Sequence, residues 1–206
     1  NPVGTNYYRI PAITTTNDGT LLAINDLRYG HAGDLGNHRI DLLLKSSTDN
    51  GENWSNEINL TKDYSNAGYG FGDAAIVADR ESDKVLILAA TGSKGYWHDN
   101  PNYVSTRNNP IRVSSFVSTD GGANFSRPND LTEQIYNFDS SWSRLFVTSG
   151  RIMQSRYIKV KIIIEYMRQF LLVEKEILLF TQITLENHGI FLEELLHQYQ
   201  MEMKLK

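Results

Sequence analysis

One eight-residue frame occurs twice in this chain and limits the folds available to it more than any other feature. Residues 47–54 and 118–125 both read S-T-D-x-G-x-N followed by an aromatic residue, and the two copies lie 71 positions apart. Each copy follows a short apolar run, at residues 40–44 and 113–117, which predicts a strand. A strand and turn repeated at a sheet-sized spacing favour a β-propeller, in which four-stranded sheets are arranged around an axis.

The chemistry of the frame suits a tight turn. The acidic, glycine and aromatic positions of the two copies are Asp49, Gly51 and Trp54, and Asp120, Gly122 and Phe125. In such a turn the carboxylate accepts backbone N–H groups, the glycine takes a positive φ angle, and the aromatic ring folds back as an apolar plug. A functional interpretation would make either aspartate a catalytic residue or a calcium ligand. Because the same turn is used twice, each time with its own aromatic plug, we favour a structural role.

A second feature is the stretch from Arg9 to Asp34, which predicts a strand, a turn and a strand. Arg9 opens the first strand, residues 17–19 (Asn-Asp-Gly) form the turn, and Arg28 ends the second strand. Asp34 follows in the next loop. A guanidinium is a rigid fork of donors that matches a carboxylate, so two of them beside one acid suit an anionic substrate that also receives a proton. The alternative is that both arginines are solvated surface residues.

Composition excludes several classes of site. The 206-residue chain has no cysteine, which rules out disulfides, thiolate metal sites and a cysteine nucleophile. Its net charge is -4 and no cluster of Lys and Arg occurs, so we expect no nucleic-acid partner. No apolar run reaches the ~18 residues of a membrane span. The five histidines lack the spacing of metal ligands, and we expect neither a metal nor a cofactor.

Together these motifs resemble those of a known family, the bacterial exo-sialidases (neuraminidases). The resemblance is carried by R-I-P at residues 9–11, by D-x-R-x-x-x-x-x-D at residues 26–34, and by the two repeated frames, which resemble the aspartate boxes of the family. It is strongest toward secreted streptococcal members of the sialidase B type and covers about residues 7–160. It implies an all-β fold in residues 1–160, a partial six-bladed β-propeller with two to two and a half blades. It also implies a parent protein that is secreted or held at the bacterial cell surface.

The resemblance also implies roles for single residues. Arg9 matches the first arginine of the triad that grips the sialic acid carboxylate. Arg28 matches the arginine that supports the next loop and touches oxygens of the sugar ring. Asp34 matches the general acid/base, and Asp73 matches the aspartate against the acyl-amino pocket. Trp97 lies where the family often has a pocket aromatic residue, with a purely structural tryptophan as the alternative.

The same resemblance leaves half of the active site unassigned. In enzymes of this family, a neutral tyrosine that is activated by a glutamate attacks the anomeric carbon. An anionic nucleophile would be repelled by the substrate's own carboxylate. No sequence context for that tyrosine, its glutamate or the second and third arginines of the triad occurs after Gly150. Arg151 lies in a G-R-I context where the family has a structural arginine, so we do not assign it to the triad. We therefore expect this chain alone to be inactive.

The composition changes after Lys161. Residues 162–206 contain one glycine and no proline, and residues that favour helix dominate them. If each codon is regrouped to take the last base of one codon and the first two of the next, residues 162–170 can spell N-Y-Y-R-I-Y-A-A-I. Residues 181–190 can then spell S-D-N-F-G-K-S-W-N, a third aspartate box. We hypothesise that residues 161–206 are a frameshifted translation, which sequencing of the coding DNA would decide.

As a polypeptide, this last part is predicted to be an aberrant tail that is helical or disordered. The two segments predicted as helices are residues 165–180 and 191–206. One interpretation is an amphipathic helix that binds a partner or a membrane surface. The interpretation that we favour is an accidental apolar peptide with no evolved place to pack, which would raise the risk of aggregation.

The function implied by the resemblance is that of an exo-α-sialidase. The parent enzyme would cleave terminal sialic acid from sialylated glycans or glycoconjugates, by hydrolysis or by intramolecular transfer to an anhydro product. Two alternatives stay open for this chain. It can be a non-catalytic sialic-acid-binding module, in which Arg9, Arg28, Tyr29 and Trp97 hold an acidic sugar. It can also be a propeller of purely structural type, in which the aspartate boxes are scaffold and the arginines are incidental.

Overall fold

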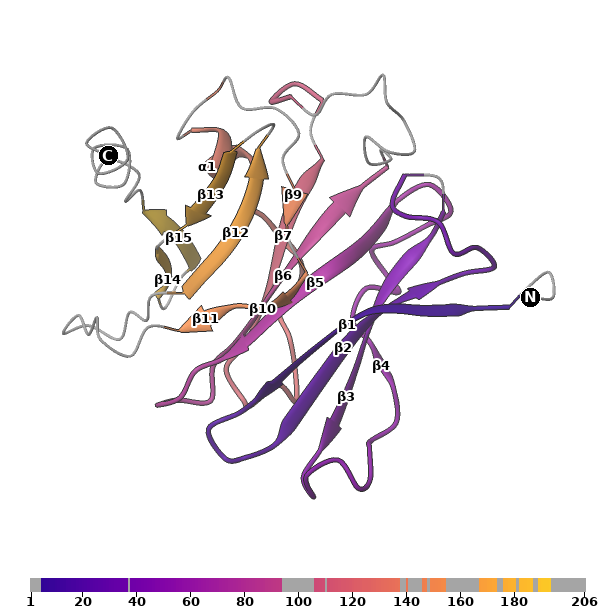
Figure 1. Ribbon diagram of the computed structural model, residues 1–206, viewed down its shortest axis with the longest axis vertical. Helices are drawn as coiled ribbons and strands as arrows, with labels where there is room; N and C mark the ends of the chain where they lie inside the picture. Colours follow the sequence, from indigo (N-terminus) through magenta and orange to yellow (C-terminus); the bar gives the residue numbers. More distant parts are fainter. Residues whose placement is uncertain are drawn as a thin grey trace.

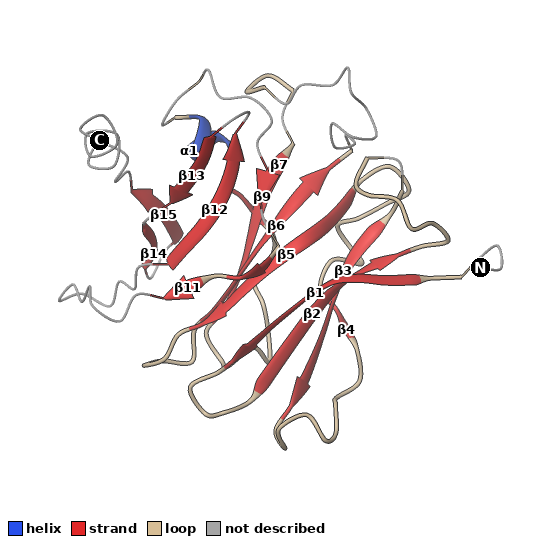
Figure 2. Cartoon of the chain, in the orientation of Figure 1, coloured by secondary structure: helices blue, strands red, loops and turns tan. Residues whose placement is uncertain are grey.

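The structure is a computed structural model that describes residues 5–36, 38–93, 106–109, 111–137, 140, 146–147, 149–154, 167–173, 176–180, 182–186 and 189–193. Strands make up most of this part of the chain, and its one helix is the short α1 (Thr132–Tyr136) (Figure 2). The all-β prediction is therefore confirmed at the level of a mostly β fold. No helix in the described ranges is long and apolar enough to cross a membrane.

Four consecutive strands form the first sheet. They are β1 (Tyr7–Thr15), β2 (Leu21–Arg28), β3 (Ile40–Ser47) and β4 (Ile58–Asn59), and each pairs antiparallel with the next. The strand, turn and strand predicted at the start of the chain are confirmed, with Gly19 at a φ of 91° in the turn.

The second sheet repeats this meander. It contains β5 (Gly70–Ala78), β6 (Val85–Gly92), β7 (Arg112–Ser118) and β8 (Asn129–Asp130), again in sequence order and antiparallel. On its other edge, β10 (Gly150–Arg151) pairs parallel with β5. The two meanders lie side by side (Figure 1), which is consistent with neighbouring blades of a partial propeller.

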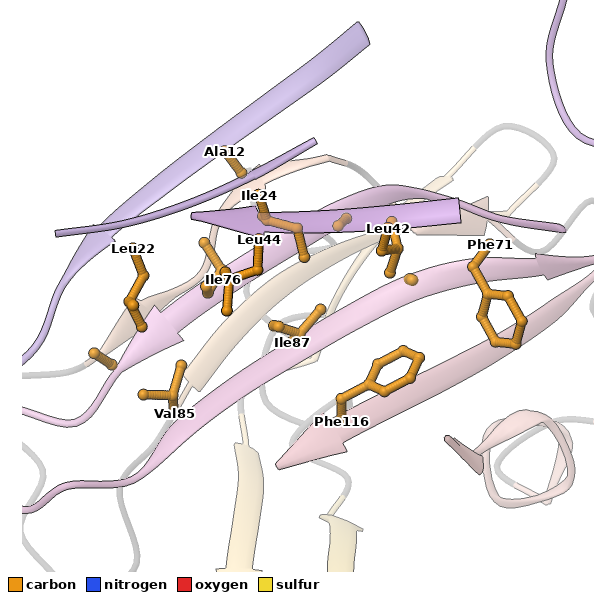
Figure 3. Close-up of a cluster of buried hydrophobic side chains, with 13 residues drawn as sticks. Ala12, Leu22, Ile24, Leu42, Leu44, Phe71, Ile76, Val85, Ile87 and Phe116 are labelled. Atoms are coloured by element: carbon orange, nitrogen blue, oxygen red, sulfur yellow. The ribbon is translucent and has the colours of Figure 1, made fainter. Parts of the chain in front are cut away.

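One apolar core joins the two sheets (Figure 3). Its buried members are Ala12, Leu22, Ile24, Leu42 and Leu44 from the first sheet, and Phe71, Ala74, Ile76, Ala78, Val85, Ile87, Ala89 and Phe116 from the second. On β2 every second residue from Leu22 to Asp26 is buried, as expected when one face of a sheet supplies the core. All residues of β5 and β6 are buried, as expected for strands that are covered on both faces. The core thus fixes the second sheet against the first.

The two repeated frames form turns with the same hydrogen bonds. Asp49 Oδ1 accepts from Ser47 Oγ at 2.8 Å and from the Asn53 backbone N at 2.9 Å, and Asp49 Oδ2 accepts from Asn53 Nδ2 at 2.8 Å. In the second turn, Asp120 Oδ1 accepts from Ser118 Oγ at 2.8 Å and from the Asn124 backbone N at 2.9 Å, and Asp120 Oδ2 accepts from Asn124 Nδ2 at 2.8 Å. The hydrogen bonds donated by the asparagine, and then the bond donated by the serine, stabilise the ionised carboxylate. They lower the pKa of each carboxyl to about 2.

The aromatic residues of the two turns differ in their surroundings. Phe125 of the second turn packs against the core between the sheets. Trp54 of the first turn is 39% exposed, and its Nε1 donates to the Gly51 carbonyl oxygen at 3.1 Å. In the described part of the chain, the apolar plug is therefore formed by the second turn, while the ring of the first turn stays exposed.

Strands also occupy the segment that was predicted to be helical. A third sheet has the order β11 (Met153–Gln154), β12 (Met167–Val173), β13 (Glu176–Phe180), and β9 (Phe146–Val147) pairs with β12. A separate pair is formed by β14 (Gln182–Glu186) and β15 (Gly189–Glu193).

The helix predicted over residues 165–180 is therefore wrong, because β12 and β13 form an antiparallel hairpin there. The second predicted helix begins inside β15, and residues 194–206 lie outside the described residues. The apolar residues of this segment form continuous runs, F-L-L-V and I-L-L-F, which fit a strand as well as a helix. Pairing of β12 with β9 and β11 then outweighs the helix propensity of these residues. The frameshift hypothesis concerns the coding DNA and stays a prediction.

Gly122→Ala is expected to destabilise the protein more than Gly121→Ala. Both glycines have positive φ angles, of 91° and 71°, so alanine is strained at either position. A Cβ at Gly122 would also lie 2.5 Å from Leu22 Cδ1, whereas a Cβ at Gly121 would meet nothing within 4 Å. We expect losses in the free energy of unfolding of roughly 2–4 and about 1 kcal/mol, respectively, by urea denaturation. Equal losses would contradict close packing of this turn against the first sheet.

The aspartates of the two turns are expected to make stability depend on acid. Their pKa of about 2 in the folded protein lies below the ordinary 3.8, so the unfolded chain binds more protons between these values. Their contribution to stability is present above the ordinary pKa and is lost as the pH falls toward the folded value. Asp120→Asn should therefore lower the melting temperature more at about pH 6 than at about pH 3. A loss that does not change with pH would show that the charge of Asp120 is not what stabilises the turn.

Candidate active site

The two arginines and the acid predicted from the sequence lie together at one end of the first sheet. Arg9 and Arg28 each donate through Nη1 to the Ala32 carbonyl oxygen, at 2.9 and 3.1 Å. Ala32 belongs to the acid loop (residues 30–36), which follows β2 and carries Asp34. The register explains this meeting, because Arg9 of β1 pairs with Asp26 of β2, two residues before Arg28 and therefore on the same face.

Arg28 is the most enclosed member of the group. Its side chain is 1% exposed, and its Nε and Nη2 donate to Asp26 Oδ2 at 3.1 and 2.7 Å. Its Nη1 reaches the acid loop, where it donates to Asp34 Oδ1 at 2.5 Å and to the Gly33 carbonyl oxygen at 3.2 Å. This arrangement fits the loop-supporting part of the role expected for Arg28. Its expected contact with a sugar ring stays a prediction.

Arg9 differs from Arg28 because it is exposed. Its Nη1 bond to the Ala32 carbonyl oxygen leaves the charge of the guanidinium unneutralised, and no ion pair joins Arg9 to a carboxylate among the described residues. An exposed, unneutralised guanidinium can take both oxygens of a ligand carboxylate. The Asp34 side chain is 23% exposed beside it. The site can therefore bind an anion next to an accessible carboxyl group.

Asp26, which is not among the predicted site residues, completes the cluster. Its side chain is fully buried, and its Oδ1 accepts from the Asp73 backbone N at 3.0 Å. Burial, and then the charge of Asp73, raise the pKa of Asp26 to about 7, against the opposing effect of Arg28. A signal for Asp26 did exist in the sequence. The D-x-R spacing within a predicted strand places both side chains on one face, where they can pair.

Matching bulges interrupt β1 and β5 next to this cluster. The register of β1 against β2 shifts after Arg9, and that of β5 against β6 shifts after Gly72. Ile10 and Asp73, which lie in the bulges, both have a φ of 53°, a region that is uncommon for residues other than glycine. Bulges of this kind re-aim groups beside active sites. The bulge in β5 turns the Asp73 N–H toward Asp26 of the first sheet.

Three further features were predicted at the site or lie near it: Asp73, Trp97, and the pair of His31 and His38. Asp73, predicted to bind substrate, is 8% exposed and joins the cluster through its backbone. Trp97 lies outside the described residues. His31 of the acid loop stacks on His38 with ring centroids 3.9 Å apart, and the Gly33 N donates to His31 Nδ1 at 2.7 Å. Within the described ranges, no group of three or more His, Asp or Glu side chains is placed to hold a metal ion.

The two arginines are expected to differ in their effect on stability. Arg28→Gln should cost roughly 3–5 kcal/mol of unfolding free energy, because it leaves the buried Asp26 carboxylate without its ion pair. Arg9→Gln removes an exposed side chain and should change stability by no more than about 0.5 kcal/mol. Urea denaturation at about pH 8, where Asp26 is ionised, measures both. Similar losses of unfolding free energy in the two variants would show that the buried ion pair of Arg28 does not contribute more to stability than the exposed Arg9.

Comparisons of the sequence with known proteins identify relatives. No family model matches the chain. A sialidase of Bacteroides fragilis is 33% identical over 155 residues, which cover 70% of this chain and 27% of the relative. A sialidase of Clostridium perfringens is 32% identical over 134 residues, covering 62% and 32%. Sialidase B of Streptococcus pneumoniae is 31% identical over 116 residues, covering 47% and 16%. The chain thus spans a third or less of the length of these relatives.

Solved structures agree with the sequence relatives. The Hadza microbial sialidase Hz136 has a TM-score of 0.66 and 25% identity, with 81% of this chain and 32% of that chain covered. The NanB sialidase from Streptococcus pneumoniae has a TM-score of 0.62 and 13% identity, covering 92% and 44%. The intramolecular trans-sialidase from Ruminococcus gnavus has a TM-score of 0.61 and 14% identity, covering 91% and 60%. The last two likenesses show a shared fold, and their coverage extends beyond residues 1–160.

Proposed function

We propose that this chain, which covers part of a sialidase domain, supplies the carboxylate-binding arginine and the acid-bearing loop of an exo-α-sialidase. The parent enzyme would release terminal sialic acid from glycoconjugates outside the bacterial cell or at its surface. One observation carries this proposal: Arg9 and Arg28 converge on the Ala32 carbonyl oxygen, beside Asp34. Sialic acid carries a carboxylate next to the bond that is cleaved, so a cationic group and a proton donor must lie close together.

The chemistry of each residue follows from its surroundings. Arg9 is exposed and has no carboxylate partner among the described residues, so it would bind the sugar carboxylate. Asp34 would donate a proton to the departing glycosidic oxygen, for which it needs the access that its 23% exposure provides. Arg28 is committed to protein acceptors and would hold the acid loop in place.

Attack on the anomeric carbon requires a nucleophile. The sialidase resemblance implies a tyrosine and its glutamate, which this chain does not supply, so we propose that the chain binds its ligand without turnover. Intramolecular transfer is a second candidate reaction for the parent enzyme, since the Ruminococcus gnavus neighbour is an intramolecular trans-sialidase. The two reactions differ in product mass, because the anhydro sugar lacks one water.

The purified chain is expected to bind the 2,3-dehydro analogue of sialic acid and to release no dye from a fluorogenic sialoside. Arg9→Ala should weaken the binding of the analogue at least roughly tenfold, because it removes the cation that pairs with the carboxylate. Arg127→Ala is the matched control, since Arg127 is an exposed arginine near the second repeated turn, away from the acid loop. Calorimetric titration measures the affinities.

Two outcomes would contradict this proposal. The first is clear turnover that is abolished by Asp34→Ala, which would show that the chain carries a complete active site. The second is the absence of binding, or binding that Arg9→Ala and Arg127→Ala weaken equally, which would favour a purely structural propeller segment.

A further inference from the structure

Asp26 connects the two sheets at the point where the candidate site lies. Its fully buried carboxylate faces a different partner with each oxygen. Oδ2 accepts from Arg28 Nε and Nη2 at 3.1 and 2.7 Å, and both residues belong to β2 of the first sheet. Oδ1 accepts from the backbone N of Asp73 at 3.0 Å, and Asp73 belongs to β5 of the second sheet. A single side chain thus joins the acid-loop arginine to the bulge of the neighbouring sheet.

The fit on the side of the second sheet is tight. A Cβ at Gly72 would lie 3.1 Å from Asp26 Oδ2, so the close approach of β5 to the carboxylate favours glycine at this position. The next residue, Asp73, has a φ of 53°, which costs conformational energy for a residue with a side chain. Such a conformation persists only where its surroundings hold it. The charge-assisted bond from the Asp73 N–H to Asp26 is a contact that does so.

In the first sheet, Arg28 connects Asp26 to the acid loop, because it donates hydrogen bonds to both. Its Nε and Nη2 are held by the buried carboxylate, which fixes the plane of the guanidinium. Its Nη1 then points at the Ala32 and Gly33 carbonyl oxygens and at Asp34 Oδ1. Without Asp26, the guanidinium would lose the partner that orients it.

We propose that Asp26 is a positioning residue, which holds the acid loop carrying Asp34 and the bulge carrying Asp73 in one fixed arrangement. It acts through Arg28 and the Asp73 N–H, because a fully buried side chain cannot touch a ligand itself. The geometric part of this proposal is independent of any activity. Its consequence for ligand binding rests on the proposed function.

The adjacent strand β3 offers a matched control. Asp41 is also fully buried, and it pairs with Arg39 two positions away, through Nε at 3.1 Å and Nη2 at 2.8 Å. Its other partners are Tyr29, Asn59 and Ser65. All of these lie in the first sheet or in the segments next to it, outside the acid loop and the bulge of β5. Asp41→Asn therefore removes a buried carboxylate that forms its hydrogen bonds with residues other than Asp26, Arg28 and Asp73, although its partner Tyr29 directly follows Arg28 in the chain.

The experiment compares the 206-residue wild type, Asp26→Asn and Asp41→Asn at about pH 8, where the Asp26 carboxylate is ionised. The NMR signals of the backbone amides and the affinity for the dehydro analogue are measured for each protein. In Asp26→Asn, the amide signals of Asp73 and of residues 32–34 should shift, and the Kd should rise roughly tenfold. In Asp41→Asn, the amide signal of Asp73 should stay in place and the Kd should change much less than in Asp26→Asn, and equal effects of the two substitutions would overturn the role of Asp26.

The possible results separate this inference from the proposed function. If the wild type does not bind the analogue, the proposed function fails, while the amide signals still decide the role of Asp26. A folded Asp26→Asn with an unchanged Asp73 amide signal overturns the role. If Asp26→Asn does not fold, hydrogen exchange of the wild type decides. An Asp73 amide as protected as the amides of β6 supports the role, whereas exchange as fast as that of an exposed turn overturns it.

Discussion

The ion pair between Asp26 and Arg28 is the interaction on which the candidate site depends. Removing two charges from water costs several kcal/mol, so such a pair adds little net stability by itself. Its main effect is to orient the Arg28 guanidinium. Both oxygens of Asp26 are engaged, and the donors of Arg28 are divided between this carboxylate and the acid loop. These bonds hold the guanidinium in the orientation that pairs it with Asp34.

The rest of the fold places the partners of this pair within reach of one another. The core between the sheets, from Leu22 and Ile24 to Phe71 and Ile76, sets β5 beside β2. The bulge after Gly72 then turns the Asp73 N–H out of its own ladder and toward Asp26. The repeated turns lie at the far ends of β3 and β7, where their aspartates bond within the turn itself. One end of the sheets thus carries the scaffold turns, and the other end carries the charged cluster.

Features that depend on neighbouring residues could be predicted from the sequence. The repeated turns and the first hairpin follow from Asp, Asn and Gly at fixed spacing, because these contacts close within a few residues. The bond from Asp73 to Asp26 spans 47 positions, and no local rule connects the two residues. Nor would propensity place the β-branched Ile10 at a φ of 53°. The hairpin of β12 and β13 was missed for a related reason, since pairing with β9 and β11 decided between two conformations that the composition allows.

We propose that Arg9, which is exposed, binds the carboxylate of sialic acid, and that Arg28 holds the acid loop beside it. The most direct measurement is a calorimetric titration of the chain with the dehydro analogue of sialic acid and with the methyl ester of the same analogue. The acid should bind, and the uncharged ester should bind at least roughly tenfold more weakly, because it cannot form an ion pair with Arg9. Equal affinity for the two would show that Arg9 does not recognise the carboxylate of the ligand.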